Sequence, residues 1–232
     1  MNDHQSFQRF AALAAIISFP LALGSIVLSG IPVNFSPDVA TNPALWLSVG
    51  ADGARLLRWG LILDMLSYYL PLLPVALFLW RWLRSRNPDW VLFYTSCGLG
   101  YILIGAIGAA ILAAVHTPLI NAYAQASVEQ RPVLETVFSA IWNMVYGGMW
   151  GILEVLLAGI WFLGIGLLLR GERRLFSIFS IILGISALLG SLGMILSVEA
   201  LALLGGVIYG LLAPIWALWL GIDLLRKPVQ ID

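Results

Sequence analysis

The chain has 232 residues, of which 61% are hydrophobic and 10% are charged, whereas soluble domains carry roughly 25% charged residues. Too few polar side chains are present to cover a water-soluble globule. The 12 Lys and Arg residues balance the 12 Asp and Glu residues, so net charge does not favour binding to nucleic acid. Composition therefore predicts an integral membrane protein that binds no nucleic acid.

Six apolar segments are each long enough to cross a bilayer, which takes about 20 residues in a helix. A helix is expected because it closes its own backbone hydrogen bonds in hydrocarbon. The segments are Phe10 to Leu28, Leu57 to Leu79, Val91 to Val115, Val145 to Leu169, Leu175 to Val198 and Ala200 to Leu225. The sequence thus predicts an all-α, polytopic membrane protein, with one bundle of six transmembrane helices over residues 1–232.

The basic residues predict the orientation of this bundle, because cytoplasmic loops carry an excess of Lys and Arg. If the N-terminus is cytoplasmic, most basic residues fall on the cytoplasmic side. These are Arg9, Arg81, Arg84, Arg86, Arg170, Arg173, Arg174, Arg226 and Lys227. We therefore expect both termini in the cytoplasm, outer loops at 31–56 and 116–144, and a location in the inner cell membrane.

The second outer loop, residues 116–144, and the helix that begins within it give two further expectations. His116, followed by Thr117 and Pro118, is expected to be exposed at the interface. A helix from Pro132 to Arg170 would be ~58 Å long at 1.5 Å per residue, against a hydrocarbon core of ~30 Å. We expect it to protrude outward, tilt strongly or break near its paired glycines, Gly147 and Gly148.

Two acidic residues lie inside predicted spans, where an ionisable group costs at least ~2.5–3.5 kcal/mol on insertion scales. Asp64 lies seven residues inward from Leu57, and Glu154 lies nine residues inward from Val145. Both are expected ~10–14 Å below the outer boundary. At such similar depths the two carboxyl groups could share a proton, a cation or a hydrogen-bonding ligand.

Helical spacing indicates which side chains accompany these acids. Tyr68 is four residues after Asp64, and Trp150 and Asn143 are expected on the face of Glu154. Arg58, about 9 Å up the helix axis from Asp64, could reach down toward it. We therefore predict an outward-facing, aromatic-lined cleft whose ligand-binding residues are Asp64, Glu154, Tyr68, Trp150, Asn143 and Arg58.

Several functions remain compatible with these residues. The protein could bind a lipid or a small apolar or amphipathic ligand in the cleft, or act as an intramembrane acid-base enzyme on a lipid or isoprenoid substrate. It could also be an accessory subunit of a membrane complex, or form homo-oligomers. Alternatively, the two acids only fix the helix register.

Other site types are poorly supported. The chain has one cysteine, Cys97, and two histidines, His4 and His116, so no metal site is predicted. No nucleotide-binding or hydrolase motif is present, and the sequence identifies no cofactor. Asp223, three residues before Arg226, is expected to form an ion pair at a helix end. Close helix packing is expected at small residues spaced four apart, which are Gly147 with Gly151, Ser186 with Gly190, and Gly206 with Gly210.

Two stretches carry a resemblance to a known family. Arg9-Phe10-Ala11-Ala12-Leu13 opens the first helix, and Arg55-Leu56-Leu57-Arg58-Trp59-Gly60-Leu61-Ile62-Leu63-Asp64 opens the second. Through the third helix, the chain resembles the bacterial membrane family called domain of unknown function 4386. This resemblance implies architecture and no activity. A weaker similarity is to small membrane terpene cyclases, which use intramembrane acids at places comparable to Asp64 and Asp223, although their surrounding motifs are absent.

Overall fold

A computed structural model describes residues 3–40, 42–227 and 229, and these form helices and no strand. Six helical stretches are long and apolar enough to cross a membrane, so the predicted all-α, six-span architecture is confirmed. The elements are α1 (Asp3–Gly30), the short turns η1 (Ile31–Val33), η2 (Pro37–Ala40) and η3 (Pro43–Val49), α2 (Gly50–Asp64), η4 (Met65–Tyr69), α3 (Leu72–Leu83), α4 (Pro88–Gln125), α5 (Arg131–Trp142), η5 (Asn143–Glu154), α6 (Val155–Leu168), α7 (Arg174–Ile195) and α8 (Glu199–Arg226).

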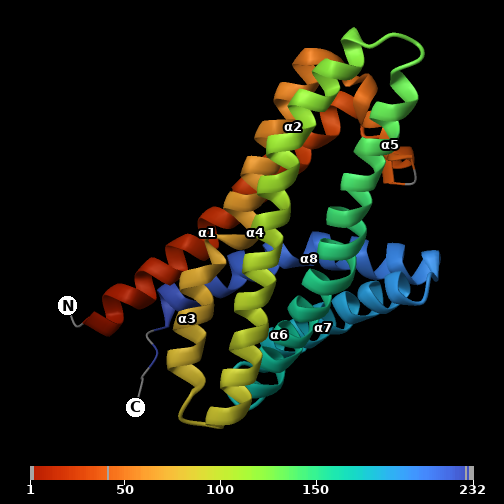
Figure 1. The fold of residues 1–232 in the computed structure, drawn as a ribbon. Coiled ribbons are helices and arrows are strands. Elements are labelled where there is room, and N and C mark those ends of the chain that lie inside the picture. The colour runs from red at the N-terminus through yellow and green to blue at the C-terminus, as the bar shows by residue number, and fades with distance from the viewer. Residues whose placement is uncertain (1–2, 41, 228, 230–232) are drawn as a thin grey trace.

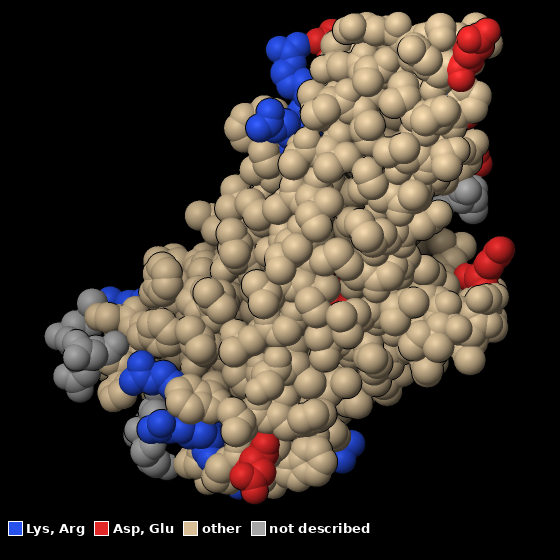
Figure 2. Space-filling model, in the orientation of Figure 1, with Lys and Arg blue, Asp and Glu red and all other residues tan. Residues whose placement is uncertain are grey.

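The helices form a bundle with two distinct ends (Figure 1). At the terminal end lie both ends of the described chain and the α3–α4 and α6–α7 turns. At the far end lie η1 to η3 and the α4–α5 and α7–α8 turns. Figure 2 shows basic side chains at the terminal end and a smaller group at the upper left, with a broad surface between them that carries almost no charge. The basic residues of the α3–α4 and α6–α7 turns thus lie at the terminal end (Figure 1).

Two hydrophobic cores follow from this arrangement. The larger core joins α1, α3, α4, α6, α7 and α8, and its centre holds Trp161 and Trp216, both fully buried. The smaller core lies toward the far end, where η3, α2, α4, α5 and η5 meet around Leu112 and Phe138. Trp150 packs against both cores.

The structure corrects the second outer connection. Helix α4 continues through Pro118 to Gln125, so only residues 126–130 separate it from α5. The helix continues because it buries apolar residues beyond the proline, and Ile120 is fully buried in the smaller core. His116 is therefore 3% exposed, and its prediction as an exposed interfacial residue was wrong.

The chain from Arg131 to Leu168 forms one 38-residue helical stretch. Its middle part, η5, is π-helical and includes Gly147 and Gly148, so the regular α-helix is interrupted where the paired glycines predicted a break. A stretch of this length is ~57 Å long at 1.5 Å per residue. In Figure 1, α4 and α5 extend to the top of the view, past the α7–α8 hairpin, which lies lower down at the right.

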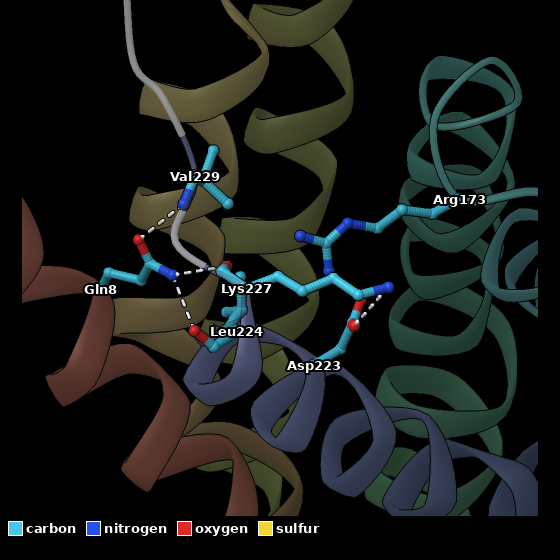
Figure 3. Close-up of polar contacts among 6 residues, drawn as sticks. All are labelled: Gln8, Arg173, Asp223, Leu224, Lys227 and Val229. Carbon is cyan, nitrogen blue, oxygen red and sulfur yellow. Dashed lines mark hydrogen bonds and ion pairs between the residues drawn. The ribbon is translucent and has the colours of Figure 1, made fainter.

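Polar contacts fasten the terminal end (Figure 3). The Gln8 side chain donates hydrogen bonds to the carbonyl oxygens of Leu224 (2.7 Å) and Lys227 (3.1 Å), and accepts one from the Val229 amide (3.1 Å). Asp223 forms ion pairs with Arg173 and, at 3.7 Å, with Lys227. Asp223 is thus a helix-end ion-pair residue, but its partners are Arg173 and Lys227 rather than the predicted Arg226.

Small residues allow α7 and α8 to pack closely, but not all at the predicted positions. A Cβ built on Gly205 would lie 2.3 Å from the Gly190 amide nitrogen, whereas one built on Gly206, Gly210 or Gly147 meets nothing within 4 Å. Gly190 therefore faces α8 as expected, and Gly205 is its partner. Gly206 and Gly210 do not pack as the predicted pair, because a Cβ on either meets no neighbour within 4 Å. The Gly206 backbone nevertheless approaches α7, since its amide nitrogen lies 3.1 Å from a Cβ built on Gly190.

Candidate ligand-binding cavity

A cavity of about 320 Å³ lies beside the α7–α8 hairpin, between the two cores. We call it the site cavity. It is lined by Asp64, Tyr68, Tyr69, Tyr146, Trp150, Gly151, Glu154, Val155, Gly190, Met194, Ala202, Leu203, Gly206, Val207, Tyr209 and Gly210. The walls therefore combine two carboxyl groups and four tyrosines with apolar side chains.

Asp64 is positioned by a change of helix type. It is the last residue of α2, and the π-helical segment η4 begins at Met65. Single π-helical turns within α-helices occur frequently at functional sites. The Oδ2 atom of Asp64 is buried and has no hydrogen-bond partner among the described residues, so its carboxyl group retains capacity to bind another molecule.

Glu154 also lies where the helix type changes. It is the last residue of the π-helical segment η5, and the α-helix α6 begins at Val155. Glu154 is 3% exposed, and its Oε1 atom accepts a hydrogen bond of 2.9 Å from the Tyr209 hydroxyl of α8. Glu154 and Asp64 both line the site cavity. Within the described part of the chain, neither acid forms an ion pair with Lys, Arg or His.

The aromatic walls are held by backbone contacts. The Tyr68 hydroxyl donates to the Gly210 carbonyl (3.1 Å), and the Trp150 indole donates to the Gly105 carbonyl (3.2 Å). The nitrogen edge of Trp150 can approach α4 because Gly108 has no side chain, since a Cβ there would be 2.3 Å from Trp150 Nε1. These contacts fix the rings beside the two acids.

The structure brings together four of the six predicted site residues: Asp64, Glu154, Tyr68 and Trp150 line the site cavity. Asn143 and Arg58 do not line it, and both are exposed. Asn143 was placed on the Glu154 face by α-helical spacing. The intervening residues are π-helical, with hydrogen bonds from i to i+5, which rotates that face away. Arg58 lies one and two-thirds α-helical turns before Asp64, on another side of α2.

Sequence reasoning missed Tyr209, which makes the direct hydrogen bond to Glu154. A signal was present, because Tyr209 is a polar aromatic residue between Gly205, Gly206 and Gly210 in an otherwise apolar helix. Ten residues separate it from Glu199, the start of α8. At 1.5 Å per residue that is ~15 Å from the helix end, close to the depth calculated for the two acids.

These features define a multi-pass, all-helical membrane protein with a cavity lined by carboxyl and aromatic side chains. The chain belongs to the family described as Domain of unknown function (DUF4386), whose model matches residues 10–227. The match extends well beyond the first half of the chain, where the residue resemblance was seen. Neither the comparison with curated proteins nor that with solved structures gives a match.

Proposed function

We propose that the protein binds a lipid or a small amphipathic molecule in the site cavity. The observation that carries this proposal is the convergence of Asp64 and Glu154, from separate helices, on one cavity of about 320 Å³. Ligand pockets commonly have volumes of ~300–1,000 Å³, with mainly apolar walls and a few polar groups. An amphipathic molecule would satisfy both kinds of wall.

Access from the bilayer supports this ligand class. Leu203 and Val207 line the site cavity, and 67% and 50% of their surfaces are exposed on α8. In a spanning helix such residues face lipid. A hydrocarbon chain could therefore lie along α8 while the polar part of the molecule contacts the carboxyl groups.

The charge distribution supports a placement for the cavity. The basic residues at the terminal end favour a cytoplasmic position for both termini, in the inner membrane of a bacterial cell. The site cavity is lined by residues from the ends of α7 and α8 nearest the far-end turn, including Met194 and Ala202. We therefore propose that the cavity opens in the outer half of the membrane.

Filling the cavity tests the proposal. Gly206 lines it, and a Cβ at Gly206 meets nothing within 4 Å, so Gly206→Leu should occupy space without displacing a helix. Gly147→Leu is the matched control, because Gly147 also has open space but does not line the cavity. The measurement is native mass spectrometry of protein purified in mild detergent, with thermal unfolding as a check on folding.

We expect wild type and Gly147→Leu to retain a bound lipid-like mass and Gly206→Leu to lose it. Asp64→Asn and Glu154→Gln should weaken retention of the same molecule, because each removes a carboxylate from the cavity. The proposal is contradicted if wild type retains no such mass, or if well-folded Gly206→Leu retains as much as wild type.

Acid catalysis on a lipid or isoprenoid substrate is the second candidate, because two carboxyl groups face the same cavity. A general acid must lie within hydrogen-bond reach of the group that it protonates. The test is turnover of the molecule identified by mass spectrometry. If Asp64→Asn and Glu154→Gln bind this molecule but no longer convert it, the site is catalytic. Unchanged turnover in both variants rules this mechanism out.

A role as an accessory subunit has less support. Gly190, one of the small residues that suggested close helix contacts, packs against Gly205 within the chain. Self-association or a partner in the membrane remains a prediction. Its measurement is the mass of the particle purified in mild detergent, and a lone monomer would contradict it.

A further inference from the structure

A second cavity, of about 160 Å³, adjoins the site cavity on the side of the smaller core. We call it the histidine cavity. It is lined by Ser25, Ser29, Trp46, Leu57, Leu61, Asp64, Leu112, His116, Trp142, Tyr146 and Trp150. Three of these residues, Asp64, Tyr146 and Trp150, also line the site cavity, so they form the wall between the two spaces.

Three polar atoms of the histidine cavity are buried without a hydrogen-bond partner in the part of the chain that the structure describes. They are Trp46 Nε1, His116 Nδ1 and Asp64 Oδ2. Trp46 is 7% exposed and His116 is 3% exposed. The large majority of buried side-chain polar atoms have a partner in known structures. Three side chains that line one cavity therefore carry unsatisfied polar atoms, which indicates that the cavity accepts a polar molecule.

Aromatic contacts hold these groups in place. The His116 ring stacks on Phe138 (5.0 Å between ring centroids) and on Trp142 (5.9 Å). Trp46 also packs against Trp142, at 5.9 Å. These stacking contacts hold the planes of the rings in the cavity wall. The polar groups of the cavity are thus arranged before any molecule enters.

The lining also indicates the charge of that molecule. No Lys or Arg lines the histidine cavity, whereas Asp64 supplies an acidic group. Four further walls are aromatic: Trp46, Trp142, Tyr146 and Trp150. Aromatic faces attract ammonium groups, and a carboxylate accepts their hydrogen bonds. An amine therefore fits this cavity and an anion does not.

We propose that the histidine cavity is a separate binding site for a small amine that also carries a hydroxyl group. The ammonium group donates to Asp64 and to His116 Nδ1, and the hydroxyl oxygen accepts the Trp46 indole N–H. The volume of about 160 Å³ suits a free small molecule rather than a lipid chain. This site goes beyond the proposed lipid-like ligand and does not require the site cavity to be occupied.

The test uses radiolabelled 2-aminoethanol and the purified full chain, with binding measured by scintillation proximity at constant ionic strength. Unlabelled ethylene glycol and glycolate serve as competitors, because they replace the amine by a hydroxyl and a carboxylate respectively. We expect saturable binding of 2-aminoethanol that ethylene glycol displaces only at concentrations at least tenfold higher, and that glycolate does not displace. Absent saturable binding, or equal competition by glycolate, overturns the proposal.

Variants locate the bound molecule. Trp46→Phe keeps an aromatic ring but removes the indole N–H, and should weaken 2-aminoethanol binding about three- to tenfold, as expected for one net hydrogen bond. His116→Gln is a second variant, expected to weaken it similarly. Trp59→Phe is the matched control, because Trp59 is 54% exposed on α2 and lines neither cavity. Unchanged affinity in both folded cavity variants contradicts the assignment.

Gly206→Leu separates this site from the proposed lipid site. Because Gly206 lines only the site cavity, its substitution should leave 2-aminoethanol binding unchanged while removing the lipid-like mass. If this folded variant loses 2-aminoethanol binding as well, the histidine cavity is not a separate site. Conversely, wild type that binds 2-aminoethanol but retains no lipid would refute the proposed lipid binding alone.

Discussion

The two ends of the molecule treat buried polar groups in opposite ways. At the terminal end several satisfy one another: Gln8 bonds to the last turn of α8, and Asp223 pairs with Arg173. Trp161 Nε1, in the larger core, is a buried atom on that side that lacks a partner in the described chain. Toward the far end, Asp64, His116 and Trp46 surround cavities with polar atoms that lack partners in the described chain. Unpaired buried groups destabilise a fold. The terminal-end contacts therefore stabilise the bundle, and the far-end groups are better explained by binding.

The largest expected difference between the two ends is their accessibility from outside the cell. A cysteine at Asn42 or Gln125, both at the far end, should react with a membrane-impermeant thiol reagent added to intact cells, whereas one at Ser85 should not. All three positions are exposed. Cys97 should stay unlabelled because it is 7% exposed. Labelling at Ser85 but not at Asn42 would place the cavities in the cytoplasmic half of the membrane.

The ion pair at the terminal end should produce the largest stability change. Only 11% of the Arg173 side chain and 16% of the Asp223 side chain are exposed. Asp223→Asn leaves Arg173 without its counter-charge and should lower the free energy of unfolding by about 3 kcal/mol, the lower end of the range for buried pairs. Thermal unfolding in detergent measures this change.

Asp52→Asn is the control for that measurement, because it removes an exposed ion pair with Arg55. The side chain of Asp52 is 91% exposed and that of Arg55 is 72% exposed. Exposed pairs contribute little, so the midpoint of unfolding should not move. If both Asn variants unfold at the wild-type temperature, the terminal-end contacts do not stabilise the bundle.

Adjacent glycines on α8 should give the next largest contrast. Gly205→Ala places a Cβ 2.3 Å from the Gly190 nitrogen of α7, whereas Gly206→Ala meets nothing within 4 Å. Overpacking of this kind costs about 1–3 kcal/mol, so Gly205→Ala should unfold at a clearly lower temperature while Gly206→Ala matches wild type. Equal midpoints for the two variants would show that α7 and α8 are not packed as closely as described.

Much of the architecture could be predicted from sequence, because segment length, apolar composition and the positions of basic residues are local properties. Asp64 and Glu154 were found for the same reason, since an acid inside an apolar span is visible without knowing its neighbours. Tyr209 was missed because its partner, Glu154, is 55 residues away along the chain. The histidine cavity depends on contacts among η3, α2 and α4, which no local pattern reveals.

Helix geometry explains the remaining errors. A proline in the sequence suggested the end of a helix, but α4 continues past Pro118 because Ile120 is buried against the smaller core. Regular α-helical spacing placed Asn143 beside Glu154, but the π-helical segment η5 lies between them. A periodicity argument holds only while the helix type is constant, and the candidate site lies where it changes.

The smallest stability change among the variants of buried side chains is expected for Trp46→Phe at the far end. This substitution removes a polar group but no hydrogen bond of the described chain. Trp46→Phe deletes an indole N–H that has no hydrogen-bond partner within the described chain, while keeping a ring against Trp142. Without added ligand the free energy of unfolding should therefore stay within about 0.5 kcal/mol of wild type, because no satisfied hydrogen bond is lost. At the same high concentration of 2-aminoethanol, wild type should gain more thermal stability than Trp46→Phe, since the stabilisation grows with the logarithm of the ligand concentration divided by Kd. A large loss of stability in the ligand-free variant would instead show that this N–H contributes to the fold, and that the two ends of the molecule do not differ as proposed.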